Sequence, residues 1–257
     1  MLGAIVGDII GSVHEGRGTK TKDFPLFVQA STFTDDTVLT AAVAEWLLTG
    51  QDLTSLLHAF YRAYPGRGYG GMFHAWAGKE RREPYMSFGN GAAMRVSPVG
   101  FAFSTLEEVL AWAERSAAVT HNHPEGIRGA QATAAAIYYA RRVKKQDDIR
   151  QRLESQFGYD LSTPLDQIRP VYRFNETCQG TVPQALRAFL ESVSYEDAIR
   201  NAISLGGDAD TLACITGGVA EAYYGGVPQD IATRAMSFLD ARLTDIVMRF
   251  RSRFGLP

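Results

Sequence analysis

The sequence predicts an all-α fold, built as one domain across residues 1–257. Apolar residues recur at helical spacing in almost every long segment, whereas the sustained alternation of apolar and polar residues that marks a half-buried strand is hard to find. A hydrophobic fraction of 46% with 21% charged residues is ordinary for a globular protein. No stretch resembles a flexible linker or a solenoid repeat, so we expect a single helical domain with long functional loops.

The first predicted helix, residues 2–14, carries glycines four positions apart. Gly3, Gly7 and Gly11 therefore share one face, on which a neighbouring backbone can approach closely. We expect this helix to be buried at the centre of the domain.

Further helices follow along the chain. One is predicted over 35–49, with Thr34 as its N-cap and Gly50 just past its end. Pro98 is expected to kink or end a later helix. The remaining predicted helices are 53–63, 71–79, 91–102, 106–119, 124–144 and 209–224, with helix starts at Thr181 with Pro183, Ser194 with Asp197, and Pro228 with Asp230. The stretches expected to be irregular are 15–33, 64–69, 81–90 and 157–180.

Composition argues against several classes of function. The formal net charge of −2 leaves no excess of Lys and Arg, so no nucleic-acid partner is expected, although a small anionic ligand fits. Cys178 and Cys214 are too few for a disulfide framework and lack the paired spacing of a zinc site, so we expect reduced thiols. The apolar N-terminal run lacks a basic lead-in, contains Asp8 and is too short to span a bilayer. We therefore expect a cytoplasmic protein with no membrane partner.

Two oxygen-rich strings stand where loops become apolar helices. The first, Thr34-Asp35-Asp36-Thr37, offers two carboxylates and two hydroxyls. Simple capping is one interpretation, because helix N-termini favour negative charge and are capped by Asp and Thr. The other interpretation is half of a metal site, because Mg²⁺ and Mn²⁺ prefer oxygen ligands.

The second string, residues 206–211, repeats this chemistry far along the chain. Gly206 and Gly207 permit a tight turn with positive φ, which lets Asp208 and Asp210 converge on one point beside Thr211. The spacing matches neither the haloacid-dehalogenase phosphatases nor the EF-hand. Two such strings in one chain predict a metal site that they share.

Three further features could contribute to a site. The loop Phe88-Gly89-Asn90-Gly91 opens a helix, where exposed amides could bind a phosphate or pyrophosphate, although a plain Asn-Gly turn is the alternative. His121 and His123 precede a long helix and could either contact a ligand or cap that helix. Glu15 follows the glycine-faced helix, where its carboxylate could reach a central site or remain solvated.

Five segments stand out when taken in order: VGDIIGSVHEG, FTDDT, FGNGAAMRVSPVG, VTHNHPEG and SLGGDADTLACITGGVAEAYYG. Together they resemble the ADP-ribosylglycohydrolase family, most closely its bacterial branch that contains the dinitrogenase-reductase-activating glycohydrolase. The resemblance runs from Ile5 to about Gly226. It implies an orthogonal multi-helix bundle around two Mg²⁺ or Mn²⁺ ions, and a hydrolase that releases ADP-ribose from a modified protein side chain or small molecule.

The resemblance also implies roles for individual residues. The implied metal ligands are Thr34, Asp35, Asp36, Asp208, Asp210 and Thr211. The pyrophosphate and proximal ribose would lie near Ser87, Phe88, Gly89, Asn90 and Gly91, with Met94 close behind. His121 matches a ligand-contacting histidine, and Glu15 an acidic residue that is catalytic or gates the entrance in some members. A further acid or base comes from a loop in some relatives, which makes Glu80 and Glu83 candidates.

The implied reaction breaks the glycosidic bond at the anomeric carbon of the distal ribose, with oxocarbenium character in the transition state. Asp35 or Asp36 would accept the proton of an attacking water whose pKa bound cations lower, and Glu15 would assist proton transfer at the scissile bond. Two other functions fit the same residues: a metal-dependent nucleotide phosphohydrolase, and a non-catalytic ADP-ribose-binding module. The sequence leaves the acceptor and the oligomeric state open.

Overall fold

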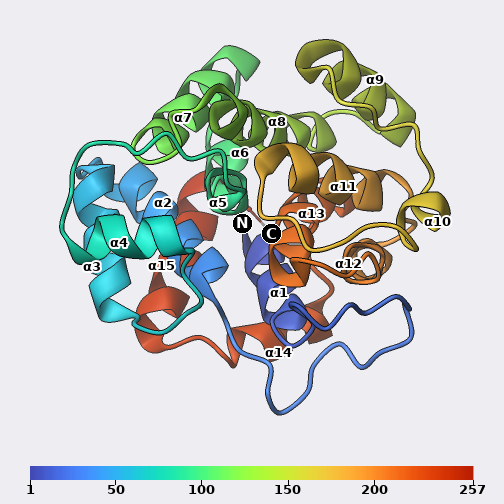
Figure 1. Ribbon diagram of the computed structural model, residues 1–257, viewed down its shortest axis with the longest axis horizontal. Coiled ribbons are helices and arrows are strands. Elements are labelled where there is room, and N and C mark those ends of the chain that lie inside the picture. The colour runs from blue at the N-terminus through green and yellow to red at the C-terminus, as the bar shows by residue number, and fades with distance from the viewer. Residues whose placement is uncertain (257) are drawn as a thin grey trace.

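The computed structural model describes residues 1–256, and these are arranged as helices and connecting loops (Figure 1). In chain order the helices are α1 (Leu2–Gly11), α2 (Asp35–Thr49), α3 (Leu53–Ala63), α4 (Gly71–Gly78), α5 (Gly91–Met94), α6 (Ser97–Ala102), α7 (Leu106–Ala118), α8 (Pro124–Ala140), α9 (Gln146–Phe157), α10 (Leu165–Ile168), α11 (Cys178–Leu190), α12 (Tyr195–Ile203), α13 (Ala209–Tyr224), α14 (Gln229–Met236) and α15 (Ala241–Phe254). Within the described residues the β-type pairing is an isolated bridge between Gly89 and Thr177. In Figure 1 the helices run in several directions around α1 and α13, which confirms the all-α, orthogonal multi-helix prediction.

The centre of the fold is an antiparallel pair, α1 against α13. Every residue of α1 is buried. A Cβ atom added to Gly3 would lie 2.3 Å from the Gly217 carbonyl oxygen, and one added to Gly7 would lie 2.0 Å from the Ala213 carbonyl oxygen. The two backbones therefore touch along the glycine face, as the spacing of the glycines predicted. This contact brings the C-terminal end of α1 to the N-terminal end of α13.

Local capping chemistry sets several helix ends where the sequence predicted them. The Thr34 hydroxyl accepts a hydrogen bond from the Asp36 amide at 3.3 Å, and Gly50 ends α2 in the left-handed region with φ 70°. The Ser194 hydroxyl accepts from the Asp197 amide at 3.1 Å and so starts α12. These residues satisfy backbone groups that would otherwise lack partners at helix ends.

Several predicted helix boundaries were wrong; α1 and α8, for example, end at Gly11 and Ala140 rather than at residues 14 and 144. The helix expected over 91–102 is divided into α5 and α6, and Pro98 lies in the first turn of α6, where its missing amide hydrogen is not needed. The helix start assigned to Thr181 and Pro183 lies earlier, because the Thr177 hydroxyl accepts from the Gly180 amide at 3.1 Å and Pro183 is inside α11. The prediction also missed α9 and the start of α15 at its N-cap Asp240.

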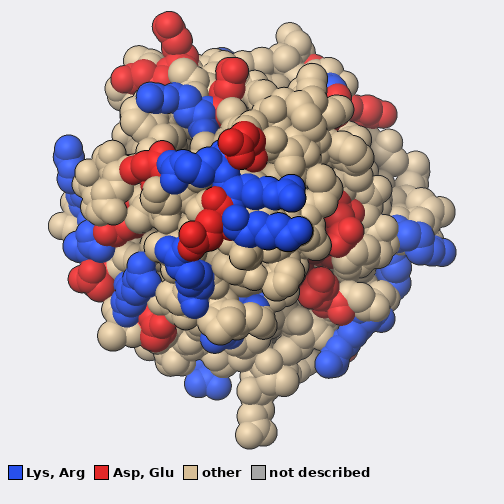
Figure 2. Space-filling view, turned by 60° about the vertical axis from the view of Figure 1, so that its left-hand side comes forward, with Lys and Arg blue, Asp and Glu red and all other residues tan. Residues whose placement is uncertain are grey.

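The surface carries both signs of charge in close alternation. Figure 2 shows Lys and Arg interspersed with Asp and Glu on the face reached by bringing the α2 to α4 side of the molecule forward. Arg82 pairs with Asp52 and Arg249 with Glu45, each at 2.7 Å. Exposed pairs of this kind contribute at most about 1 kcal/mol each, so they shape the charge pattern more than they stabilise the fold. No helix among residues 1–256 has both the length and the apolar character needed to cross a bilayer.

Candidate active site

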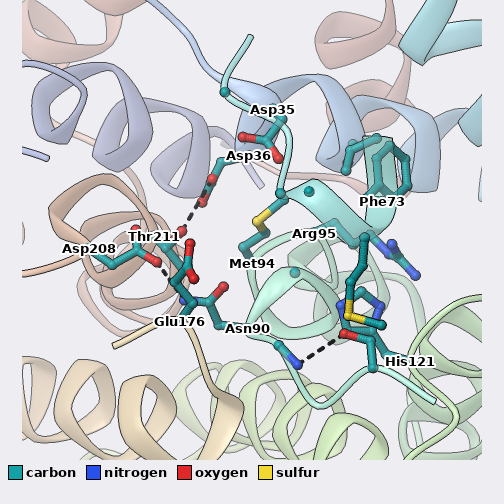
Figure 3. Close-up of a pocket in the computed structure, with 18 of the residues that line it drawn as sticks. Asp35, Asp36, Phe73, Asn90, Met94, Arg95, His121, Glu176, Asp208 and Thr211 are labelled. Atoms are coloured by element: carbon teal, nitrogen blue, oxygen red, sulfur yellow. Dashed lines mark hydrogen bonds between the residues drawn. The ribbon is translucent and has the colours of Figure 1, made fainter. Parts of the chain in front are cut away.

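Both oxygen-rich strings open into one cavity, at the junction of the loop after α1, the N-terminal turns of α2 and α13, and the loop before α5 (Figure 3). The residues expected in the site that line this cavity are Glu15, Asp35, Asp36, Ser87, Gly89, Asn90, Gly91, Met94, His121, Asp208, Asp210 and Thr211. Figure 3 shows the Asp36 carboxylate pointing toward Thr211, whose hydroxyl lies 3.3 Å from Asp36 Oδ2. The segments that the sequence separates by most of its length therefore meet in space.

Asp8, on α1, organises the first acidic turn, and the sequence analysis did not assign it to the site. Its Oδ2 accepts hydrogen bonds from the Thr34 and Thr37 amides, both at 3.0 Å, and from the Thr37 hydroxyl. Its Oδ1 accepts from the Thr34 hydroxyl at 2.7 Å. The signal that could have found it is a single carboxylate on an otherwise apolar helix predicted to be central, because a buried charge needs partners.

The carboxylates form two groups that share one member. Oxygen atoms of Asp8, Asp36 and Asp210 lie within 4.8 Å of one another, and so do those of Glu15, Asp208 and Asp210. Asp36 Oδ1 is buried and has no hydrogen-bond partner in the described structure. A buried, unpaired carboxylate oxygen among hard oxygen donors fits a divalent cation such as Mg²⁺ or Mn²⁺. The donor set therefore fits the metal centre that the sequence predicted.

The electrostatics of the cluster also favour bound cations. Burial raises the pKa of Asp36 and of Asp210 well above the ordinary value, and neighbouring carboxylates raise both further. The pKa of Asp35 is raised in the same way, first by burial and then by Asp8 and Asp208. Since like charges at this spacing repel strongly in a buried site, the ionised cluster needs positive charge to be stable at neutral pH.

Glu15 reaches the cluster from the long loop after α1. The loop is attached to the turn before α13, because the Gly16 amide donates to the Gly207 carbonyl at 3.2 Å and the Lys20 ammonium donates to the Leu205 carbonyl. Partial burial raises the pKa of Glu15, and the nearby Asp208, Glu176 and Asp8 raise it further. Glu15 is thus an acid that retains its proton to higher pH than an isolated glutamate.

Asn90 holds the second acidic string from the opposite wall. Its side-chain amide donates to Asp208 Oδ2 at 2.7 Å and to the Thr181 hydroxyl at 3.1 Å. Its backbone amide donates to the Glu176 carbonyl at 2.7 Å, and the Gly89 amide donates to the Ser87 hydroxyl at 3.1 Å. These two amides are already used within the protein, so they are not available to bind an anion.

Other expected site residues lie away from the cavity. Phe88 does not line it: the ring is 45% exposed and lies 5.3 Å from the His123 ring. Thr34 is not among the lining residues either, and its hydroxyl donates to Asp8 Oδ1 at 2.7 Å. Glu80 is ion-paired with Arg62 and 68% exposed, and neither Glu80 nor Glu83 lines the cavity.

The two histidines have the two different roles that the sequence left open. His123 is the N-cap of α8, where its Nδ1 accepts from the Glu125 amide at 3.1 Å. His121 is buried against the cavity, with Nδ1 2.7 Å from the Thr120 hydroxyl. Burial lowers the pKa of His121 well below its ordinary value, with a smaller contribution from Arg95. His121 is therefore neutral at physiological pH.

Comparison with known proteins finds relatives that match most of this chain. ADP-ribosylhydrolase ARH3 of Xenopus tropicalis is 26% identical over 300 residues, which cover 88% of this chain and 86% of its own. ADP-ribosylhydrolase ARH3 of Homo sapiens is 25% identical over 307 residues, covering 88% of this chain and 84% of its own. A solved structure described as an ADP-ribosylglycohydrolase-related protein complex matches with a TM-score of 0.68 and 25% identity, covering 99% of this chain and 97% of that chain.

The family assignment does not depend on these relatives alone. The sequence profile of the ADP-ribosylglycohydrolase family matches residues 1–255. Five separate segments carried the same resemblance in the sequence, and the acidic residues in three of them meet in one cavity. The chain therefore belongs to the ADP-ribosylglycohydrolase family.

Proposed function

We propose that the protein is a metal-dependent hydrolase that cleaves the glycosidic bond at the anomeric carbon of the distal ribose and releases ADP-ribose from a modified protein side chain or small molecule. The observation that supports this most directly is the pair of carboxylate groups that share Asp210, with a buried, unpaired oxygen on Asp36. A binding module has no need of so many buried carboxylates, because each one costs free energy unless a cation neutralises it. The two free cysteines are buried, which is consistent with a cytoplasmic location.

Two Mg²⁺ or Mn²⁺ ions are the proposed cofactors. Asp35, Asp36, Asp208, Asp210 and Thr211, which line the cavity, would hold them, with Glu15 next to Asp208 and Asp210. Thr34 would join them from the edge of the site, since its hydroxyl lies 3.5 Å from Asp36 Oδ2. Asp8 would orient the ligands rather than bind metal, since its oxygens already accept four hydrogen bonds from Thr34 and Thr37. When bound, the ions would supply Lewis acidity toward the ribose hydroxyls and a water molecule.

The protein's own groups would carry the proton transfers. Asp35 or Asp36 would accept the proton of the attacking water, and Glu15, whose pKa is raised, would donate a proton to the leaving acceptor. Ser87, Gly89, Gly91, Met94 and His121 would form the wall along which the rest of ADP-ribose lies. Binding energy from that wall would position the anomeric carbon over the carboxylates.

The test is release of intact ADP-ribose from a panel of defined ADP-ribosyl linkages, assayed with Mg²⁺, with Mn²⁺ and after metal stripping into EDTA. Asp36→Asn should abolish turnover, and Asp245→Asn, at an exposed ion pair on α15, is the matched control. Full activity in EDTA after stripping would refute the metal mechanism. Release of AMP or phosphate would indicate a phosphohydrolase, and calorimetric binding of ADP-ribose without hydrolysis of any linkage would indicate a binding module.

A further inference from the structure

A buried arginine without a carboxylate partner lies beside the cavity. Arg95 follows α5, is 0% exposed and lines the cavity wall (Figure 3). Its Nη2 donates to the Ser116 carbonyl and to the Thr120 hydroxyl, both at 2.8 Å, while Nε and Nη1 have no hydrogen-bond partner among residues 1–256. Burial lowers the pKa of Arg95 to about 10, which leaves it charged at neutral pH. An unpaired buried charge is expensive, so this arrangement needs an explanation.

Helix packing explains only part of the environment of the Arg95 guanidinium. Ser116 lies in the last turn of α7, so the guanidinium faces the negative end of that helix dipole. This contact stabilises the positive charge. It does not explain why the same nitrogen also donates to Thr120, whose hydroxyl lies 2.7 Å from His121 Nδ1.

The Thr120 hydroxyl connects the arginine to the histidine. A hydroxyl has one hydrogen to donate and two lone pairs to accept with. Arg95 can only donate, so it occupies a lone pair of Thr120 and leaves the hydroxyl hydrogen available to His121 Nδ1. A neutral imidazole that accepts at Nδ1 carries its proton on Nε2.

The Nε2 edge of His121 faces the glycine loop of the cavity. A Cβ atom added to Gly91 would lie 3.1 Å from Nε2, and one added to Gly89 would lie 3.6 Å from it. The amides of Gly89 and Asn90 are already used, so a donor from His121 would add a hydrogen bond to this stretch of wall. An oxygen that carries negative charge is the complementary ligand group.

We propose that Arg95, acting through Thr120, holds neutral His121 in the Nε2-protonated tautomer, so that the ring donates a hydrogen bond to an anionic oxygen of the bound ligand. Arg95 and Thr120 are positioning residues, because neither needs to touch the ligand. The tautomer is a property of the protein alone. The ligand contact rests on the proposed function, in which the ligand contains a pyrophosphate.

The tautomer can be measured directly by long-range ¹H–¹⁵N NMR of histidine-labelled protein. We expect the Nε2-protonated pattern for His121 in the native protein and in Thr120→Ser, which keeps the hydroxyl. Thr120→Val and Arg95→Met should lose it, giving a mixed or Nδ1-protonated ring. The proposal would be overturned if native His121 carries its proton on Nδ1. In that arrangement the Thr120 hydroxyl would donate toward Tyr85 instead of His121.

Calorimetric titration with ADP-ribose tests the consequence for binding. Thr120→Val should weaken the affinity about tenfold, the loss expected for one hydrogen bond to a charged group, and Thr120→Ser should restore most of it. Thr133→Val is the matched control, because Thr133 is also buried but its hydroxyl has no partner. Equal affinity in Thr120→Val and Thr133→Val would overturn the ligand contact. Failure of the native protein to bind ADP-ribose would count against the proposed function, while the NMR result would still decide the role of Arg95.

Discussion

Asp8→Asn separates the charge of Asp8 from its role in folding. An asparagine with its oxygen at the Oδ2 position still accepts from the Thr34 and Thr37 amides and from the Thr37 hydroxyl. Its amide group can donate to the Thr34 hydroxyl, which at present donates to Oδ1. Asp8→Ala, by contrast, removes all four acceptor contacts. The two variants therefore distinguish loss of charge from loss of hydrogen bonding.

The expected change in the free energy of unfolding follows from the spacing of the carboxylates. Oxygens of Asp8, Asp36 and Asp210 lie within 4.8 Å of one another. At that separation and an effective dielectric constant of about 20, two full charges repel by about 3 kcal/mol, and partial protonation of the cluster reduces this. We expect metal-free Asp8→Asn to be about 1–3 kcal/mol more stable than the native protein. Asp8→Ala should be less stable, because each unsatisfied buried amide costs about 1–3 kcal/mol.

Urea unfolding in EDTA and in excess Mn²⁺ measures the effect of losing the Asp8 charge and the effect of losing its hydrogen bonds. In EDTA we expect Asp8→Asn to be the most stable, the native protein to be intermediate and Asp8→Ala to be the least stable. Bound metal stabilises a protein in proportion to the logarithm of its affinity, so the gain on adding Mn²⁺ should be smaller in Asp8→Asn than in the native protein. If Asp8→Asn is destabilised in EDTA as much as Asp8→Ala, repulsion between the carboxylates does not limit the stability of the metal-free protein.

Three further predictions concern the site and its support. Asp210→Asn should lower kcat/KM by roughly 10³ or more with the helical circular dichroism unchanged, because both carboxylate groups share this residue. In EDTA the native protein should lose thermal stability as pH rises above about 4, because the raised pKa values of Asp36 and Asp210 mean that the folded state binds more protons than the unfolded state. Melting temperatures between pH 5 and pH 8 test this, and excess Mn²⁺ should remove the trend. Gly7→Ala should cost about 3 kcal/mol or more in urea unfolding, because its Cβ would lie 2.0 Å from the Ala213 carbonyl oxygen, whereas Gly71→Ala, whose Cβ meets nothing within 4 Å, should cost little.

The parts of the site that the sequence predicted are those with local signals. Thr34 and the adjacent carboxylates mark a helix start by their own chemistry, and the paired glycines before Asp208 mark a turn; Gly206 and Gly207 do have φ values of 72° and 76°. The histidines were ambiguous because a residue just before a helix can cap it or face a ligand, and here His123 does the first while His121 lies in the cavity.

The parts that were missed depend on contacts between distant segments. Asp8 accepts hydrogen bonds from the amides of Thr34 and Thr37 at the start of α2, and the sequence around Asp8 gives no sign of these partners. The amides of Gly89 and Asn90 looked available in a glycine-containing loop, but one pairs with a nearby hydroxyl and the other with a carbonyl on the segment before α11. A sequence shows which groups can donate a hydrogen bond, but it does not show whether the folded chain already uses them.

The sequence presented the glycine face of α1 and the acidic strings as separate features. In the structure they form a single packed unit. A Cβ atom added to Gly11 would lie 2.4 Å from the Asp210 Cα, so the end of α1 rests directly on the backbone of the second string. Asp8, one turn earlier on α1, bonds to the first string. Because α1 approaches α13 this closely, one helix can hold both strings within reach of a shared centre. A residue larger than glycine on that face would move α13 outward and carry Asp210 away from Asp36, so the packing of the core and the geometry of the site depend on the same contact.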